Sequence, residues 1–171
     1  MALIKREKPN DSIKKFELSA RHKYRAGLTL ISGGDATTGI EQLGYSAEML
    51  LKSAYFRFVR SRIGLRRTTS VITGHMLRDA AREGIRLHIR YDPESYHSLL
   101  FWGLLLAGIR KDHARPLPPE IEDEMLTRMR ELHRLWMIEH RYQNRIYGSS
   151  DVARMDLNVT WLIENYEQLW R

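Results

Sequence analysis

A chain of 171 residues is long enough for one domain with a sizeable core, and 43% hydrophobic with 29% charged residues is a globular composition that excludes a disordered chain. The sequence has no cysteine, which excludes disulfides, thiolate-bound zinc and iron–sulfur clusters. The net charge of +7 comes from 21 arginines and 7 lysines against 21 acidic residues, so anionic partners are a reasonable expectation.

The first third of the chain predicts two long helices that form a hairpin. Apolar residues recur every three to four positions from Ile13 to Ile31, with Asn10 or Asp11 as the N-cap and Gly33-Gly34 at the end. Asp35 then opens a second helix. Its apolar stripe, which continues toward Ile63, consists of Ile40, Leu43, Ala47, Leu50, Ala54 and Phe58.

The next segment predicts a short helix and an extended connection. Thr73 is a favourable N-cap for a helix from Gly74 to about Glu83, and Gly84 is expected to end it. Residues Arg86 to Tyr91 alternate like a strand, but a lone strand has no partner, so we expect an extended connection here.

The second half predicts three more helices. Asp92-Pro93 is a start signal for a helix that carries the apolar run Leu99–Ile109 and ends near His113. Three prolines make residues 115–119 a loop, after which a fifth helix starts near Pro119 and carries Met125, Met129, Leu132 and Trp136 on one side. Ser149 or Ser150 caps the last helix, whose apolar positions are Val152, Met155, Val159, Leu162, Tyr166 and Leu169.

These elements predict one all-α domain over residues 1–171, an antiparallel bundle of about six helices. The longest apolar run has eleven residues, which is shorter than the roughly 20 that span a bilayer. No apolar segment follows the basic start, because Pro9 to Asp11 come next, so a secretory signal is not expected. We therefore expect a cytoplasmic protein without a membrane segment.

No cofactor or metal site is predicted. The seven histidines show no short paired spacing such as HxH or HExxH. Arginines gather in two places, either as a binding patch or as a solvated charged face. They are Arg57, Arg60, Arg62, Arg66 and Arg67 around Gly64, and Arg78, Arg82, Arg86 and Arg90 at a spacing of four.

Two stretches, Tyr45–Lys52 and Thr73–Asp79, resemble the HEPN family, named for nucleotide binding in higher eukaryotes and prokaryotes. The family's A-E-x-x-L-K-A, H-D-L and R-Y motifs correspond here to Ala47, Glu48, Leu51 and Lys52, to His75, Met76 and Leu77, and to Arg141 and Tyr142. Met76 replaces the usual acidic residue, and Gln143 stands where many relatives have proline. The resemblance covers roughly residues 10–170, with an enlarged middle over residues 85–119.

The resemblance implies a helical bundle that often forms a homodimer and acts as a metal-independent RNase or as a noncatalytic binder of nucleotide or RNA. The ligand-binding residues expected on this basis are Lys52, His75, Arg78, Arg141 and Tyr142. A nucleotidyltransferase-like partner protein is also implied, as for an RNase toxin and its antitoxin.

Catalytic members of the family carry an arginine, then four to six other residues, then a histidine, so that the imidazole moves a proton while the guanidinium steadies the phosphate. Arg128 and His133 have this spacing, and three other pairs in the chain share it. Five residues along one helix place two side chains about 140° apart, so Arg128 and His133 would meet only between two copies. We expect a noncatalytic or weakly catalytic domain that binds nucleotide, RNA or a partner protein. The alternatives are an RNase toxin using Arg128 and His133, and a structural interaction module with the Leu99–Ile109 helix as its interface.

Overall fold

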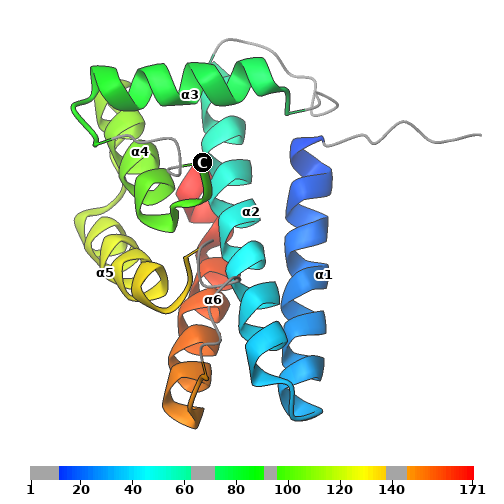
Figure 1. The fold of residues 1–171 in the computed structure, drawn as a ribbon. Helices are drawn as coiled ribbons and strands as arrows, with labels where there is room; N and C mark the ends of the chain where they lie inside the picture. The colour runs from blue at the N-terminus through cyan, green and yellow to red at the C-terminus, as the bar shows by residue number, and fades with distance from the viewer. Residues whose placement is uncertain (1–11, 63–71, 91–95, 138–145) are drawn as a thin grey trace, which may run out of the picture.

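The computed structural model describes residues 12–62, 72–90, 96–137 and 146–171, and it leaves the side chains of residues 61 and 62 undescribed. These ranges hold six helices, so the predicted all-helical bundle is confirmed (Figure 1). The three long helices α1, α2 and α6 lie side by side, α4 and α5 lie on one side of them, and α3 lies across one end. None of the described helices is long and apolar enough to cross a membrane.

Helices α1 (Ile13–Ser32) and α2 (Ala36–Arg62) form the predicted antiparallel hairpin. The predicted cap at Asn10 or Asp11 is wrong, because the hydroxyl of Ser12 accepts from the Lys15 amide at 3.2 Å and fills the N-cap position. Asp35 caps α2 as predicted, since its carboxylate accepts from the Thr38 amide at 3.0 Å. All members of the predicted α2 stripe are buried.

Helix α3 (Gly74–Arg86) begins as predicted, with the Thr73 hydroxyl accepting from the Met76 amide at 3.3 Å. The predicted end at Gly84 is wrong, and so is the extended connection at Arg86, because the helix continues to that residue. Gly84 allows close packing inside the helix: a Cβ there would lie 2.7 Å from the Phe101 ring. The turn comes at His88, whose φ of 57° is left-handed.

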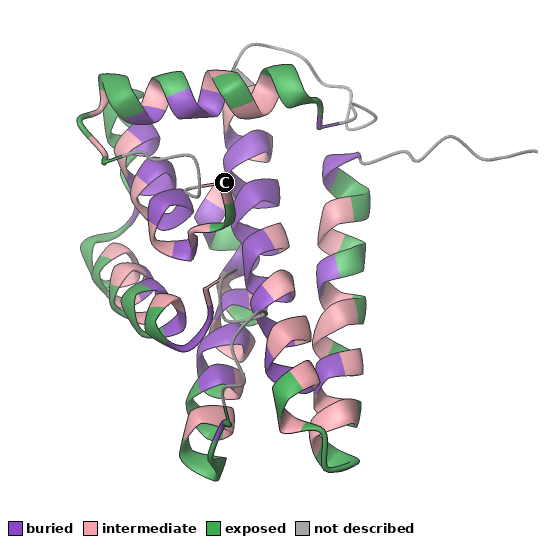
Figure 2. Ribbon diagram, viewed as in Figure 1, coloured by how far each residue is buried: buried purple, intermediate pink, exposed green. Residues whose placement is uncertain are grey.

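Helix α4 (Leu99–Asp112) begins later than Asp92-Pro93, which lie outside the described residues, so the predicted start is wrong. The hydroxyl of Ser98 accepts from the Phe101 amide at 3.1 Å and satisfies the first turn. The helix is buried over most of its length, as Figure 2 shows. Its apolar run therefore packs into the bundle and leaves little surface for the interface that the structural alternative requires.

Helix α5 (Pro119–Leu135) starts at the predicted proline, with Glu120 and Glu122 in its first turn. Helix α6 (Ser149–Trp170) starts one residue earlier than predicted, because Gly148 is its N-cap and donates its amide to Asp151 at 3.2 Å. The predicted apolar residues of both helices are buried, except that Val152 is half-buried. Trp136 was predicted on the fifth helix, but it lies just after the end of α5, in extended backbone.

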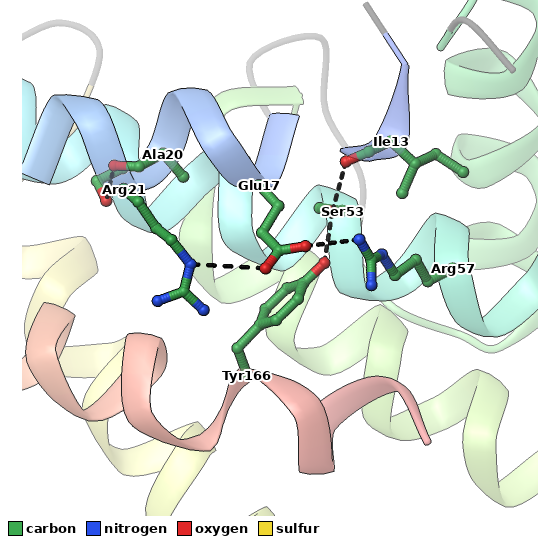
Figure 3. A network of polar contacts seen from close by, with 8 residues as sticks. Ile13, Glu17, Ala20, Arg21, Ser53, Arg57 and Tyr166 are labelled. Carbon is green, nitrogen blue, oxygen red and sulfur yellow. Dashed lines mark hydrogen bonds and ion pairs between the residues drawn. The ribbon is translucent and has the colours of Figure 1, made fainter. Parts of the chain in front are cut away.

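A buried polar network joins α1, α2 and α6 (Figure 3). The Ser53 hydroxyl donates to the carbonyl of Ile13 at 3.0 Å and lies 2.6 Å from the hydroxyl of Tyr166. Arg57 stacks on the Tyr166 ring and donates to Glu17 at 2.5 Å. These contacts link the three helices to one another. The Nε of Arg57 is buried but has no hydrogen-bond partner among the described residues.

Candidate functional site

The predicted ligand residues lie on two helices. Lys52 is on α2, whereas His75 and Arg78 are on α3, and Arg141 and Tyr142 lie outside the described residues. Lys52 is buried, with 7% of its surface exposed. Its ammonium contacts the Glu48 carboxylate and lies 5.4 Å from the centre of the Trp102 ring. Lys52 is therefore engaged inside the protein and is not presented to a ligand.

Glu48 is the centre of this cluster, which also includes the exposed side chain of His97. The ring of His97 lies 3.2 Å from the carboxylate. Burial by itself would raise the pKa of Glu48, but the hydrogen bond from His97 and the charge of Lys52 outweigh this effect and hold the pKa below its usual value. The carboxylate therefore stays ionised, and Lys52 supplies part of the charge that it needs.

Helix α3 presents a row of arginines to solvent. Arg78, Arg82 and Arg86 are spaced by four residues and all are exposed, and we refer to them as the α3 arginine row. Arg82 is only 3.3 Å from Asp79, and Arg86 forms ion pairs with Glu83 at 2.8 Å and with Asp112 at 2.7 Å.

Arg78 differs from the other members of the row. It forms no ion pair or side-chain hydrogen bond with the part of the chain that the structure describes. His75, one turn earlier, is also exposed but pairs with Asp79 at 2.8 Å. Of the predicted ligand residues that are described, Arg78 is thus the one whose charge is fully available to an outside anion.

A pocket of about 250 Å³ lies between α2 and α3, next to the arginine row. It is lined by Tyr55, Phe56, Val59, Arg60, Met76, Asp79 and Ala80. Most of these side chains are apolar, and Asp79 supplies a carboxylate that accepts hydrogen bonds. The pocket therefore combines an apolar interior with a charged rim, which is the usual make-up of a small-molecule site.

Tyr55 is the unusual member of this lining. Only 3% of its surface is exposed, yet its hydroxyl makes no hydrogen bond to any described residue. Burial raises the pKa of Tyr55, and the charges of Glu83 and Asp79 raise it further, so the phenol stays neutral. Buried tyrosine hydroxyls normally find a partner. The Tyr55 hydroxyl can therefore still donate and accept a hydrogen bond at the pocket.

Arg128 and His133 lie on α5, away from α3. Arg128 donates to Glu124 at 2.5 Å and to Asn158 at 3.0 Å, and its guanidinium stacks 5.4 Å from the centre of the Trp161 ring. Both residues belong to one continuous helix, so their side chains project about 140° apart. Within one chain they do not form a common site.

Sequence reasoning missed Tyr55 as a site residue, because a tyrosine among apolar positions of a helix is typical of a core. Asp79 belongs to the stretch that resembles the family, but the spacing gave no sign that it would line a pocket. Among the described residues, no group of three or more histidine, aspartate or glutamate side chains is placed to hold a metal ion. Comparison with known proteins gives no match to a family model, to a curated protein or to a solved structure.

Proposed function

We propose that this chain is a noncatalytic HEPN-like helical domain that binds RNA at the end of the bundle covered by α3. The observation that carries the proposal is the α3 arginine row, in which exposed guanidinium groups follow one side of a helix and Arg78 has no counter-charge among the residues that the structure describes. The planar guanidinium group of arginine can donate two parallel hydrogen bonds to the oxygens of a phosphate. Phosphate contacts dominate the affinity of nucleic-acid binding.

The noncatalytic part of the proposal rests on α5. Arg128 already donates to Glu124 and to the buried Asn158, so recruiting it to a phosphate would leave the Asn158 oxygen without this donor. His133 projects from another side of the same helix. A nuclease would therefore need two copies of the chain and a rearranged Arg128.

The test is the binding of a fluorescent single-stranded RNA, followed by anisotropy between about 50 and 200 mM salt. Affinity should fall steeply with salt in the unmodified chain. In the double variant Arg78→Ala/Arg82→Ala the slope of log affinity against log salt should be smaller by about 1.4, because each lost phosphate contact on a single strand removes about 0.7.

The matched control is Arg115→Ala/Arg130→Ala, which removes the same charge from two exposed arginines outside α3. Neither side chain forms an ion pair with the described part of the chain. The control should keep the original slope. Equal losses in both double variants would mean that overall charge, and not the α3 arginine row, carries binding. An affinity that does not respond to salt would indicate a protein interaction module instead.

The homodimer and the nucleotidyltransferase-like partner remain predictions from the family resemblance. Light scattering of the purified chain measures its mass in solution directly. A mass of about twice 20.2 kDa is expected for the homodimer. A monomer that binds RNA would retain the proposed function and remove the dimer from it.

A further inference from the structure

We infer that the pocket between α2 and α3 holds one base of the bound RNA, and that Tyr55 and Asp79 select bases with an exocyclic amino group. This inference rests on the proposed function and names what the same surface recognises. It starts from the hydroxyl of Tyr55, which has no hydrogen-bond partner in the described part of the chain, on a residue that is 97% buried and yet lines an open pocket.

Size and lining favour a single base. The pocket of about 250 Å³ is smaller than the roughly 300–1,000 Å³ typical of drug-sized ligands, so it cannot take a length of RNA. Phe56, Val59 and Met76 give it an apolar interior. A base has two apolar faces that stack on such side chains, and the thioether of methionine makes favourable contacts with aromatic rings.

The polar groups at the rim match the edge of an amino-bearing base. The Asp79 carboxylate can only accept hydrogen bonds, and the Tyr55 hydroxyl can donate or accept. Adenine, cytosine and guanine each carry an amino group that donates. Uracil instead presents two carbonyl oxygens beside one N–H, and these oxygens would face the carboxylate without a proton between them. Arg60 also lines the pocket, but its side chain already has an interaction partner within the protein. The Asp79 carboxylate therefore sets the preference, and the rim disfavours uracil.

The surroundings of the pocket connect it with the phosphate surface. His75 and Arg82 hold Asp79 from the solvent side, at 2.8 and 3.3 Å. Arg82 belongs to the α3 arginine row, so a base in the pocket would place its own phosphate beside that row. Sequence and phosphate recognition then come from adjacent parts of one helix.

The experiment measures the binding of AMP, CMP, GMP and UMP to the full chain by calorimetry. The three amino-bearing nucleotides should bind more tightly than UMP by about tenfold, the value of one good hydrogen bond. Tyr55→Phe should weaken all three by about tenfold or less. Because this hydroxyl makes no hydrogen bond to any residue that the structure describes, the variant should keep its melting temperature, so a loss of binding is not a loss of folding.

Asp79→Asn is the selectivity test, since an amide can donate to uracil as well as accept. The preference over UMP should fall to about one. Glu83→Gln removes a carboxylate from the same helix, outside the pocket lining, and should leave the preference unchanged. Equal affinity for all four nucleotides, or a preference that survives Asp79→Asn, would overturn the inference. If RNA binding still depends on salt and on Arg78 in that case, the proposed function stands without it.

Discussion

The hydroxyl of Tyr166 on α6 lies 2.6 Å from the hydroxyl of Ser53 on α2, and Ser53 in turn donates to the Ile13 carbonyl on α1. Since the single Ser53 proton is used on the carbonyl, Tyr166 is the donor to Ser53. Burial raises the pKa of Tyr166 to about 12, so the phenol keeps its proton.

Replacing this serine should destabilise the protein. Ser53→Ala leaves the Tyr166 hydroxyl and the Ile13 carbonyl without their partner in the core, and the expected loss is about 1–3 kcal/mol in the free energy of unfolding. Urea denaturation measures it. Ser19→Ala, an exposed serine on α1, is the control and should change stability by less than about 0.5 kcal/mol. Equal stability of the two variants would contradict the role of the network.

The buried pair Glu48 and Lys52 should behave as one structural unit. Glu48→Gln leaves the buried ammonium without its counter-charge and is expected to cost about 3–5 kcal/mol of stability. Adding Lys52→Met should recover most of this loss, because the orphaned charge is then gone. A double variant no more stable than Glu48→Gln alone would show that Lys52 is not held there by Glu48.

The same carboxylate predicts a pH dependence. The pKa of Glu48 is lower in the folded protein than the value of about 4.3 in an unfolded chain. Its contribution to stability is therefore complete above about pH 4.3 and is lost as the pH falls through the folded pKa. Urea denaturation between about pH 6 and 3 should show this loss. The loss of unfolding free energy between about pH 6 and 3 should be smaller in Glu48→Gln. If that variant loses as much stability in acid as the unmodified chain, Glu48 is not the source of the pH dependence.

Arg128→Ala should affect stability and not catalysis. The substitution removes a donor to the buried Asn158 and a stacking partner of Trp161, at an expected cost of about 1–3 kcal/mol. Arg130→Ala on the same helix is the control, because that side chain is exposed. RNA incubated with the unmodified chain should remain intact. Cleavage that disappears in both Arg128→Ala and His133→Ala would establish the nuclease alternative.

Gly44→Ala tests how closely α2 approaches the end of α5. A Cβ at Gly44 would lie 2.3 Å from the ring of Trp136, which is buried and cannot move aside. We expect a loss of about 1–3 kcal/mol from overpacking, even though alanine is the better helix former. Gly74→Ala is the control: its Cβ would meet only the tip of Arg78, at 3.6 Å, so thermal unfolding should show little change or a small gain.

The helix ends show how far the sequence can be trusted for the fold. Thr73 and Asp35 cap α3 and α2 as predicted, because a cap depends on a side chain and an amide three residues away. Gly84 was misread as an end. Position 84 needs a glycine because the Phe101 ring on α4 leaves no room for a Cβ. Phe101 is seventeen positions later in the chain, so a local sequence pattern cannot reveal this contact.

The candidate site was predictable only in part. The exposed arginine spacing on α3 was visible, since residues four apart share a side of a helix. Lys52 looked like a ligand-binding residue, but burial against Trp102 and pairing with Glu48 use its charge internally. The pocket could not be predicted, because its lining residues come from two different helices, and no sequence pattern shows how these two helices pack against each other.

The sequence by itself determined six helical segments, the N-caps Asp35 and Thr73, and the residues of the apolar sides, because these depend on contacts within one or two helical turns. The tertiary structure decided which polar side chains keep an unused hydrogen-bond donor or acceptor. Within the described ranges, the Tyr55 hydroxyl and the Arg78 guanidinium have no hydrogen-bond or ion-pair partner, whereas Lys52 and Arg128 have one. Helix packing brings those partners together or keeps them apart, and the free groups are the ones that a ligand can use.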